Sequence, residues 1–98
     1  MAFFALSYEY GADYMAKRDP FKDGHTDHLK AAIARGEVVF AGAAMEGAVP
    51  FGFVVFKTDD AATVEAFAKA DPYVTGGVSK SWKVRPWYGV TGPGAVGA

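Results

Sequence analysis

The sequence predicts an α+β fold in which two helices cover one face of a four-stranded antiparallel sheet. Four apolar runs with strand character alternate with two stretches of helical periodicity, in the order β-α-β-β-α-β. The two middle strands follow each other across a short turn, which is typical of a hairpin. This order is the split βαβ, or ferredoxin-like, arrangement, and 98 residues are enough for one such domain.

The first strand is predicted at residues 2–9, a continuous aromatic and aliphatic run that ends just before Gly11. The mixed, charged stretch 12–22 contains Pro20 and allows only a short helical turn, at Asp13–Lys17.

The first long helix is predicted at residues 24–35, with Asp23 as its N-cap. Gly36 stands where a glycine commonly ends a helix. The residues with the spacing of one helix face are His25, Leu29, Ala32 and Ile33.

Strands at 37–45 and 51–58 form the predicted hairpin. A second helix follows at 58–70, with Thr58 or Asp59 as its cap. Its apolar stripe consists of Val64, Phe67 and Ala68.

The last strand is predicted at residues 79–88. Residues 89–98 lack bulky side chains, so we expect a flexible C-terminal tail after a domain at 1–88.

Composition narrows the classes of partner. The net charge of −1 gives no electrostatic reason to expect nucleic acid or an acidic membrane surface. The first residues lack a basic segment and are too short an apolar run to be a signal peptide or a membrane span. The chain has no cysteine, which excludes disulfides and thiolate chemistry and fits a cytoplasmic location.

Several strands have no polar side. An antiparallel sheet with one wet face should alternate apolar and polar residues, but 38–43 and 51–56 are apolar throughout. Because no further segment of the chain is left to cover the second face, we expect a homodimer packed sheet to sheet.

The chemistry of the chain centres on His25. It shares a helix face with Leu29, so its ring points toward the sheet, and an imidazole titrates near neutral pH. In the split βαβ fold the two helices run antiparallel on one face, which brings Asp71 toward His25. A carboxylate there would orient the ring for acid–base work. From spacing alone, a structural hydrogen bond between the two residues is an equal alternative.

The second histidine, His28, is interpreted as a solvated helix residue. A histidine pair three residues apart needs a third ligand to hold a metal, and none is placed for it, so we expect no metal and no cofactor. Asp71 and Pro72 also have a simpler interpretation, because proline ends a helix and aspartate caps the following turn.

The segments "RDPFKDGHTDHL", "GEVVFAGA", "ADPYVTGGV" and "WKVRPW" resemble the YCII-related (YciI-like) proteins. The shared pattern has a basic residue before a histidine, a glycine that ends the helix, an Ala-Gly pair in the next strand and an Asp-Pro-Tyr turn. The resemblance runs from the first strand to about residue 87. It implies a dimeric α+β barrel with a His–Asp pair at the active site, which maps onto His25 and Asp71.

Two departures from the family pattern bear on ligand recognition. Relatives often have an arginine three residues before the histidine, whereas this chain has Lys22, with Arg18 further upstream. Lysine keeps the charge but lacks the bidentate fork of arginine. Relatives often read Ala-Gly-Pro where residues 41–43 read Ala-Gly-Ala, at the expected floor of the pocket.

Some relatives resemble small lyases or dehydrochlorinases that act on hydroxylated rings, and muconolactone isomerases share the fold type. The leading hypothesis is therefore a cofactor-free enzyme for a small cyclic or aromatic molecule, with His25 as acid and base and Asp71 as its orienting carboxylate. Arg18 and Lys22 would attract an anionic substrate, and Tyr73 would line the pocket. The alternatives are a non-catalytic module that binds or senses a metabolite, and a purely structural clamp.

Overall fold

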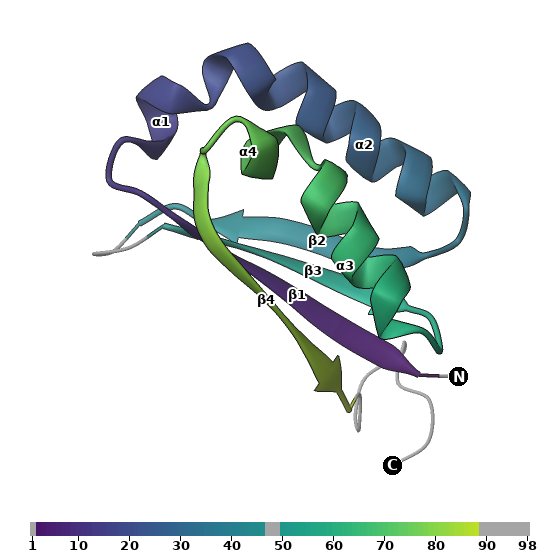
Figure 1. Cartoon of the computed structure of the whole chain (residues 1–98). Coiled ribbons are helices and arrows are strands. Elements are labelled where there is room, and N and C mark those ends of the chain that lie inside the picture. Colours follow the sequence, from purple (N-terminus) through teal and green to yellow (C-terminus); the bar gives the residue numbers. More distant parts are fainter. Residues whose placement is uncertain (1, 47–49, 89–98) are drawn as a thin grey trace.

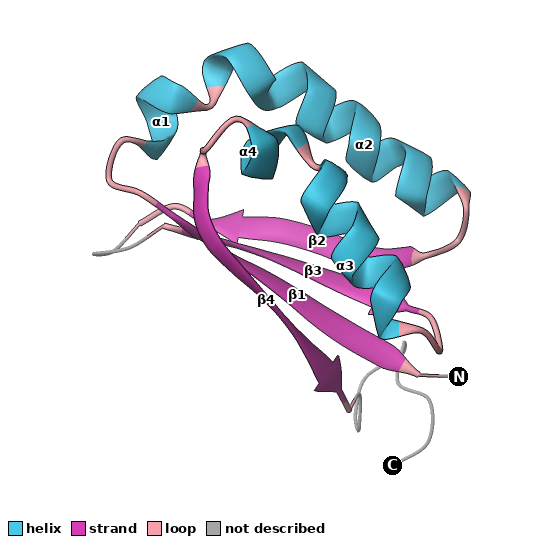
Figure 2. Cartoon of the chain, in the orientation of Figure 1, coloured by secondary structure: helices cyan, strands magenta, loops and turns pink. Residues whose placement is uncertain are grey.

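A single antiparallel sheet organises the molecule. The computed structural model describes residues 2–46 and 50–88, and the predicted flexible tail at 89–98 lies outside this part. The strand order is β2-β3-β1-β4, so the first strand lies inside the sheet and the hairpin forms one side of it (Figure 2). The strands are β1 (Phe3–Tyr10), β2 (Val38–Ala44), β3 (Phe51–Lys57) and β4 (Ser79–Trp87).

The helices all lie on one face of this sheet (Figure 1). The two long ones are α2 (Lys22–Ala34) and α3 (Ala61–Ala70), which confirms the predicted fold class. Three short segments gather near the N-terminal end of α2 and lead into or out of the long helices. They are α1 (Tyr14–Lys17), η1 (Asp19–Phe21) and α4 (Pro72–Thr75).

The core lies between the helices and the sheet. Alternate residues of a strand point to opposite faces, and in β3 Gly52, Val54 and Phe56 are buried while Phe51 and Lys57 are exposed. The predicted stripe of α3 is buried against them. The largest fully buried side chains are Tyr8, Phe56, Leu6, Val64, Val78 and Asp71.

The start and the buried face of α2 differ from the prediction. Asp23 is not the N-cap, because η1 runs directly into α2 and Phe21 takes the cap position without a side-chain hydrogen bond. Asp23 lies instead in the first turn, where a negative charge favours the helix dipole. Ile33 is 53% exposed, whereas Ala32 is fully buried and His28 and Leu29 are partly buried, so His28 rather than Ile33 belongs to the inward face.

The ends of the helices show how local chemistry positions them. Gly36 ends α2 with a φ of 78°, as predicted for a glycine at that position. The cap of α3 is Asp60 rather than Thr58 or Asp59, because Asp60 has an extended backbone and its Oδ1 accepts a hydrogen bond from the Ala62 N–H at 2.9 Å. None of the described helices combines the length and the apolar character that crossing a membrane requires.

Candidate active site

A cavity of about 320 Å³ opens on the helix side of the sheet, beside the N-terminal half of α2. This volume is at the small end of the range for metabolite pockets. Strands β1, β2 and β3 form one wall, and α1, α2 and α4 form the other. The lining includes Tyr8, Tyr10, Tyr14, Arg18, Lys22, His25, Thr26, Leu29, Gly52 and Tyr73.

Asp71 lies directly behind this cavity and is fully buried. Pro72 cannot donate a backbone hydrogen bond, so α3 stops and Asp71 adopts an extended conformation that makes it the N-cap of α4. Its Oδ1 accepts the Tyr73 N–H at 3.0 Å, and its Oδ2 accepts the Tyr8 hydroxyl at 2.7 Å. The residue that ends one helix and begins the next therefore carries a held, inward-pointing carboxylate.

His25 contacts this carboxylate from α2. Its Nδ1 lies 2.8 Å from Oδ1 and 3.0 Å from Oδ2 of Asp71, and its side chain is 13% exposed. An ionised carboxylate only accepts hydrogen bonds, so Nδ1 carries the hydrogen and Nε2 of the neutral ring keeps a lone pair. No described residue hydrogen-bonds to Nε2. The Tyr73 ring stacks on the imidazole at 3.8 Å and 4°, which fixes the plane of the ring.

Tyr8 completes the arrangement, although no pattern in the sequence assigned it a role. Burial, together with the nearby charge of Asp71, raises the pKa of the Tyr8 phenol far above its ordinary value, so the hydroxyl stays neutral and donates to the carboxylate. One signal was present in the sequence. Leu6 and Tyr8 are two residues apart in one strand and therefore share the face that the helices cover.

Aromatic rings form a continuous side of the cavity. Tyr10 and Tyr14 stack at 4.3 Å, and Tyr73 stands edge-on to both rings, at 6.0 and 6.2 Å. Burial and neighbouring Tyr14 raise the pKa of Tyr73 to about 12, and burial likewise raises the pKa of Tyr10. These hydroxyls are therefore neutral hydrogen-bond donors at physiological pH.

The two predicted cations are at the same cavity. Arg18 and Lys22 both line it, and the Arg18 guanidinium lies 5.6 Å from the centre of the Tyr14 ring. The Arg18 Nε is buried and, within residues 2–46 and 50–88, has no hydrogen-bond partner; the nearest carboxylate oxygen, on Asp19, is 4.0 Å away. A buried N–H without an acceptor is unfavourable, so this position suits an anionic ligand.

Small residues form the floor. Ala41, Gly42 and Ala43 line the cavity, as expected for the Ala-Gly-Ala segment. Gly52 lies beside them, and a Cβ at this residue would overlap the Tyr10 hydroxyl. The glycine therefore leaves room for the Tyr10 hydroxyl against β3.

His28 is not the solvated residue that the sequence indicated. Its Nε2 lies 2.8 Å from the carbonyl oxygen of Phe67 in α3, and its ring stacks on the Phe67 ring at 4.1 Å. The prediction was wrong because it assumed that Ile33, rather than His28, completes the inward face. Within the described part of the chain, no group of three His, Cys, Asp or Glu side chains could hold a metal ion.

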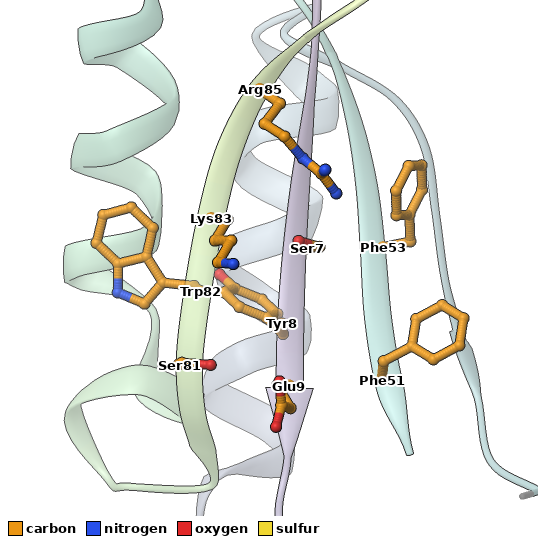
Figure 3. A pocket seen from close by; sticks show the side chains of 9 residues that line it. All are labelled: Ser7, Tyr8, Glu9, Phe51, Phe53, Ser81, Trp82, Lys83 and Arg85. Carbon is orange, nitrogen blue, oxygen red and sulfur yellow. The ribbon is translucent and has the colours of Figure 1, made fainter. Parts of the chain in front are cut away.

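A second hollow, of about 410 Å³, lies on the open face of the sheet, away from the helices (Figure 3). Phe51 and Phe53 border one side, and Lys83 and Arg85 of β4 border the other, with the Arg85 side chain reaching over β1. It contains no histidine and, despite its size, does not touch the His25–Asp71 pair. The smaller cavity is therefore the candidate active site.

Comparisons with known proteins agree with this fold. The family model of the YCII-related domain matches residues 1–88. A solved structure of similar fold is 5-chloro-2-hydroxyhydroquinone dehydrochlorinase from Burkholderia phenoliruptrix AC1100, in complex with 2,5-dihydroxybenzoquinone. The two chains are 15% identical and superpose with a TM-score of 0.70 over 89% of this chain and 93% of the other. A search of curated protein sequences returned no match.

Proposed function

Because the chain belongs to the YCII-related domain family, whose model spans residues 1–88, we propose that it is a small acid–base enzyme with His25 as its catalytic residue. One observation carries this proposal: His25 lies in the wall of a cavity with its Nδ1 bound to the buried carboxylate of Asp71. Asp71 is then the orienting group, as carboxylates are in other catalytic histidine pairs.

The geometry supports proton abstraction followed by elimination or isomerisation. Nε2 of His25 takes a proton from a carbon or hydroxyl of the substrate, and Asp71 stabilises the imidazolium that forms. The electron pair of the broken bond moves into the substrate. It either forms a double bond as a leaving group departs with its own electron pair, or it shifts within a conjugated system until the imidazolium returns the proton elsewhere. Such catalysis contributes about 10²–10⁴-fold to a rate.

The cavity favours a small, flat, anionic molecule. The Arg18 N–H, which has no acceptor among the described residues, and the Lys22 ammonium provide positive charge. The tyrosines provide aromatic faces and neutral donors. The dehydrochlorinase of similar fold was solved with a dihydroxybenzoquinone. Hydroxylated quinones and chlorinated hydroquinones are therefore the first compounds to test.

The decisive experiment compares turnover of these compounds by the native chain, His25→Gln and Asp27→Asn. Asp27 is exposed on the same helix and serves as the matched control. On any active substrate we expect kcat to fall by about 10²-fold or more in His25→Gln, while Asp27→Asn stays at the native value. Native turnover by His25→Gln would refute the proposal.

The same cavity also supports a second candidate function, a metabolite-binding module, because the Arg18 N–H would bind an anion whether or not the anion reacts. Ligand recovered unchanged after tight binding to the native chain would favour this alternative. The purely structural interpretation predicts no ligand binding at all and only a loss of stability in the His25 variant.

We also propose that a second copy of the chain covers the open face of the sheet. Large apolar side chains on this face are exposed, with Phe40 at 71% and Phe51 at 46%. Exposed apolar surface of this kind commonly marks an interface. The sheet-to-sheet homodimer expected from the sequence would bury this surface.

A further inference from the structure

The C-terminal end of α3 leaves one carbonyl group in need of a donor. In a continuing helix the N–H of residue 71 would bond to the Phe67 oxygen. Here the Asp71 N–H bonds to Ala68 at 3.2 Å instead, because Pro72 ends the helix and Asp71 turns out of it. The Phe67 oxygen is thus one of the orphan acceptors that every helix end must satisfy.

His28 supplies the missing donor from the neighbouring helix. Its Nε2 lies 2.8 Å from the Phe67 oxygen, and because a carbonyl oxygen only accepts, Nε2 carries the hydrogen. The His28 ring also stacks on the Phe67 ring. Phe67 is itself fixed in the core, 4% exposed and edge-on to Phe56 at 5.0 Å. The hydrogen bond of His28 is therefore made to a residue that the core already holds in place.

The two histidines hold the same end of α3. His25 and His28 are one turn apart on α2, and their partners Asp71 and Phe67 are separated by one turn at the end of α3. The backbones of α2 and α3 approach each other closely at few points, and these two side chains bond directly from α2 to the C-terminal end of α3. Besides the packing of Ala32 and Leu29 on the core, two polar contacts one turn apart constrain the rotation of α2 about its own axis more tightly than the His25 contact alone.

We propose that His28 is a positioning residue for the His25–Asp71 pair. By bonding to Phe67, it sets the rotation of α2 at which His25 Nδ1 meets the Asp71 carboxylate. Only the effect of His28 on catalysis rests on the proposed function; its effect on the position of α2 does not. The geometry itself is testable without a substrate, so native turnover by His25→Gln would refute the proposed function and leave this inference standing.

The test is an NMR measurement of the His25 Nδ1–H in the full chain, by its resonance and its rate of exchange with water. His28→Gln keeps a donor of similar reach, His28→Phe keeps the stacking ring, and His28→Ala keeps neither. Val84→Ala is the control for general loss of stability, because Val84 packs on the core from β4 and does not line the cavity.

We expect exchange of the His25 Nδ1–H to accelerate about tenfold in His28→Ala and His28→Phe, the factor that corresponds to one typical hydrogen bond. His28→Gln should restore a rate close to that of the native chain, and Val84→Ala should lower the melting temperature without moving the His25 signal. An unchanged His25 signal in all three His28 variants would overturn the proposal. Rescue by Phe but not by Gln would overturn the hydrogen bond as its basis.

Discussion

Asp71 is the residue on which the candidate site depends most. A carboxylate removed from water needs hydrogen bonds in compensation, and Asp71 receives them from the Tyr73 backbone, the Tyr8 hydroxyl and the His25 ring. These donors come from three different elements, so the carboxylate joins α4, β1 and α2. A residue proposed for catalysis is therefore also a point of structural connection.

The contribution of Tyr8 to this network is directly measurable. Replacing Tyr8 with Phe keeps the buried ring and removes only the hydroxyl, leaving Asp71 Oδ2 with fewer donors. We expect the free energy of unfolding to fall by about 1–3 kcal/mol, the range for a buried group that loses its partner. Urea denaturation of the variant measures it. Tyr88→Phe is the control, because Tyr88 is 82% exposed; equal midpoints for both variants would contradict the role of Tyr8.

Part of this site could be predicted from the sequence, namely the approach of Asp71 to His25. Topology alone predicted that Asp71 approaches His25, because antiparallel helices on one face bring the end of one beside the start of the other. The contact at 2.8 Å was not predictable, since it depends on side-chain conformations and on the exact rotation of α2. Tyr8 was missed because strand periodicity shows only that its ring is buried, and says nothing of what its hydroxyl meets.

Among the helices and strands, the helix ends show most clearly which features the sequence predicts and which it does not. Proline and glycine act through the backbone of a single residue, so Gly36 and Pro72 were assigned correctly from the sequence. N-caps were assigned less well, because the consecutive residues Thr58, Asp59 and Asp60 offer similar capping chemistry. The extended backbone of Asp60 and the hydrogen bond that it accepts from the Ala62 N–H distinguish it from Asp59.

The positive φ of Gly36, in the turn between α2 and β2, can be tested by substitution. Gly36 has a φ of 78° and open space where a Cβ would be, so Gly36→Ala introduces backbone strain and no clash. We expect a loss of about 1–2 kcal/mol of stability, the cost of the left-handed conformation for alanine. Gly42→Ala is the matched control. It also has open space but no positive φ, and its unfolding midpoint should stay near that of the native chain. Equal losses in both variants would contradict this account.

The whole molecule has two unlike faces. The helix face holds the core and the cavity. The open face combines Phe40 of β2 and Phe51 and Phe53 of β3 with Lys83 and Arg85 of β4. The sequence predicted the apolar character of the strands in the hairpin, because their runs lack polar positions. It also predicted that these two strands pair with each other, which the structure confirms. The exact register of the residues across the sheet was not predicted, since it depends on long-range packing.

The proposed homodimer makes a prediction for the open face as a whole. Phe40, Phe51 and Phe53 border one apolar hollow there, and covering it with a second copy removes these side chains from water. Phe40 is the most informative position, because it is 71% exposed in the single chain and a charge there leaves the fold intact. Phe40→Glu would place a carboxylate inside the interface and raise the dissociation constant of the dimer.

The dissociation constant is measured by sedimentation velocity of the native chain and of two variants, Phe40→Glu and Ile33→Glu. Ile33 is 53% exposed on the outer side of α2, so its variant adds the same charge to a surface that the dimer does not use. We expect the native chain and Ile33→Glu to sediment at twice the 10.4 kDa mass of one chain. Phe40→Glu should dissociate at concentrations about tenfold higher or more, as for a central interface residue. A native chain that stays monomeric at micromolar concentration, or a Phe40→Glu variant as dimeric as Ile33→Glu, would rule out this face as the interface.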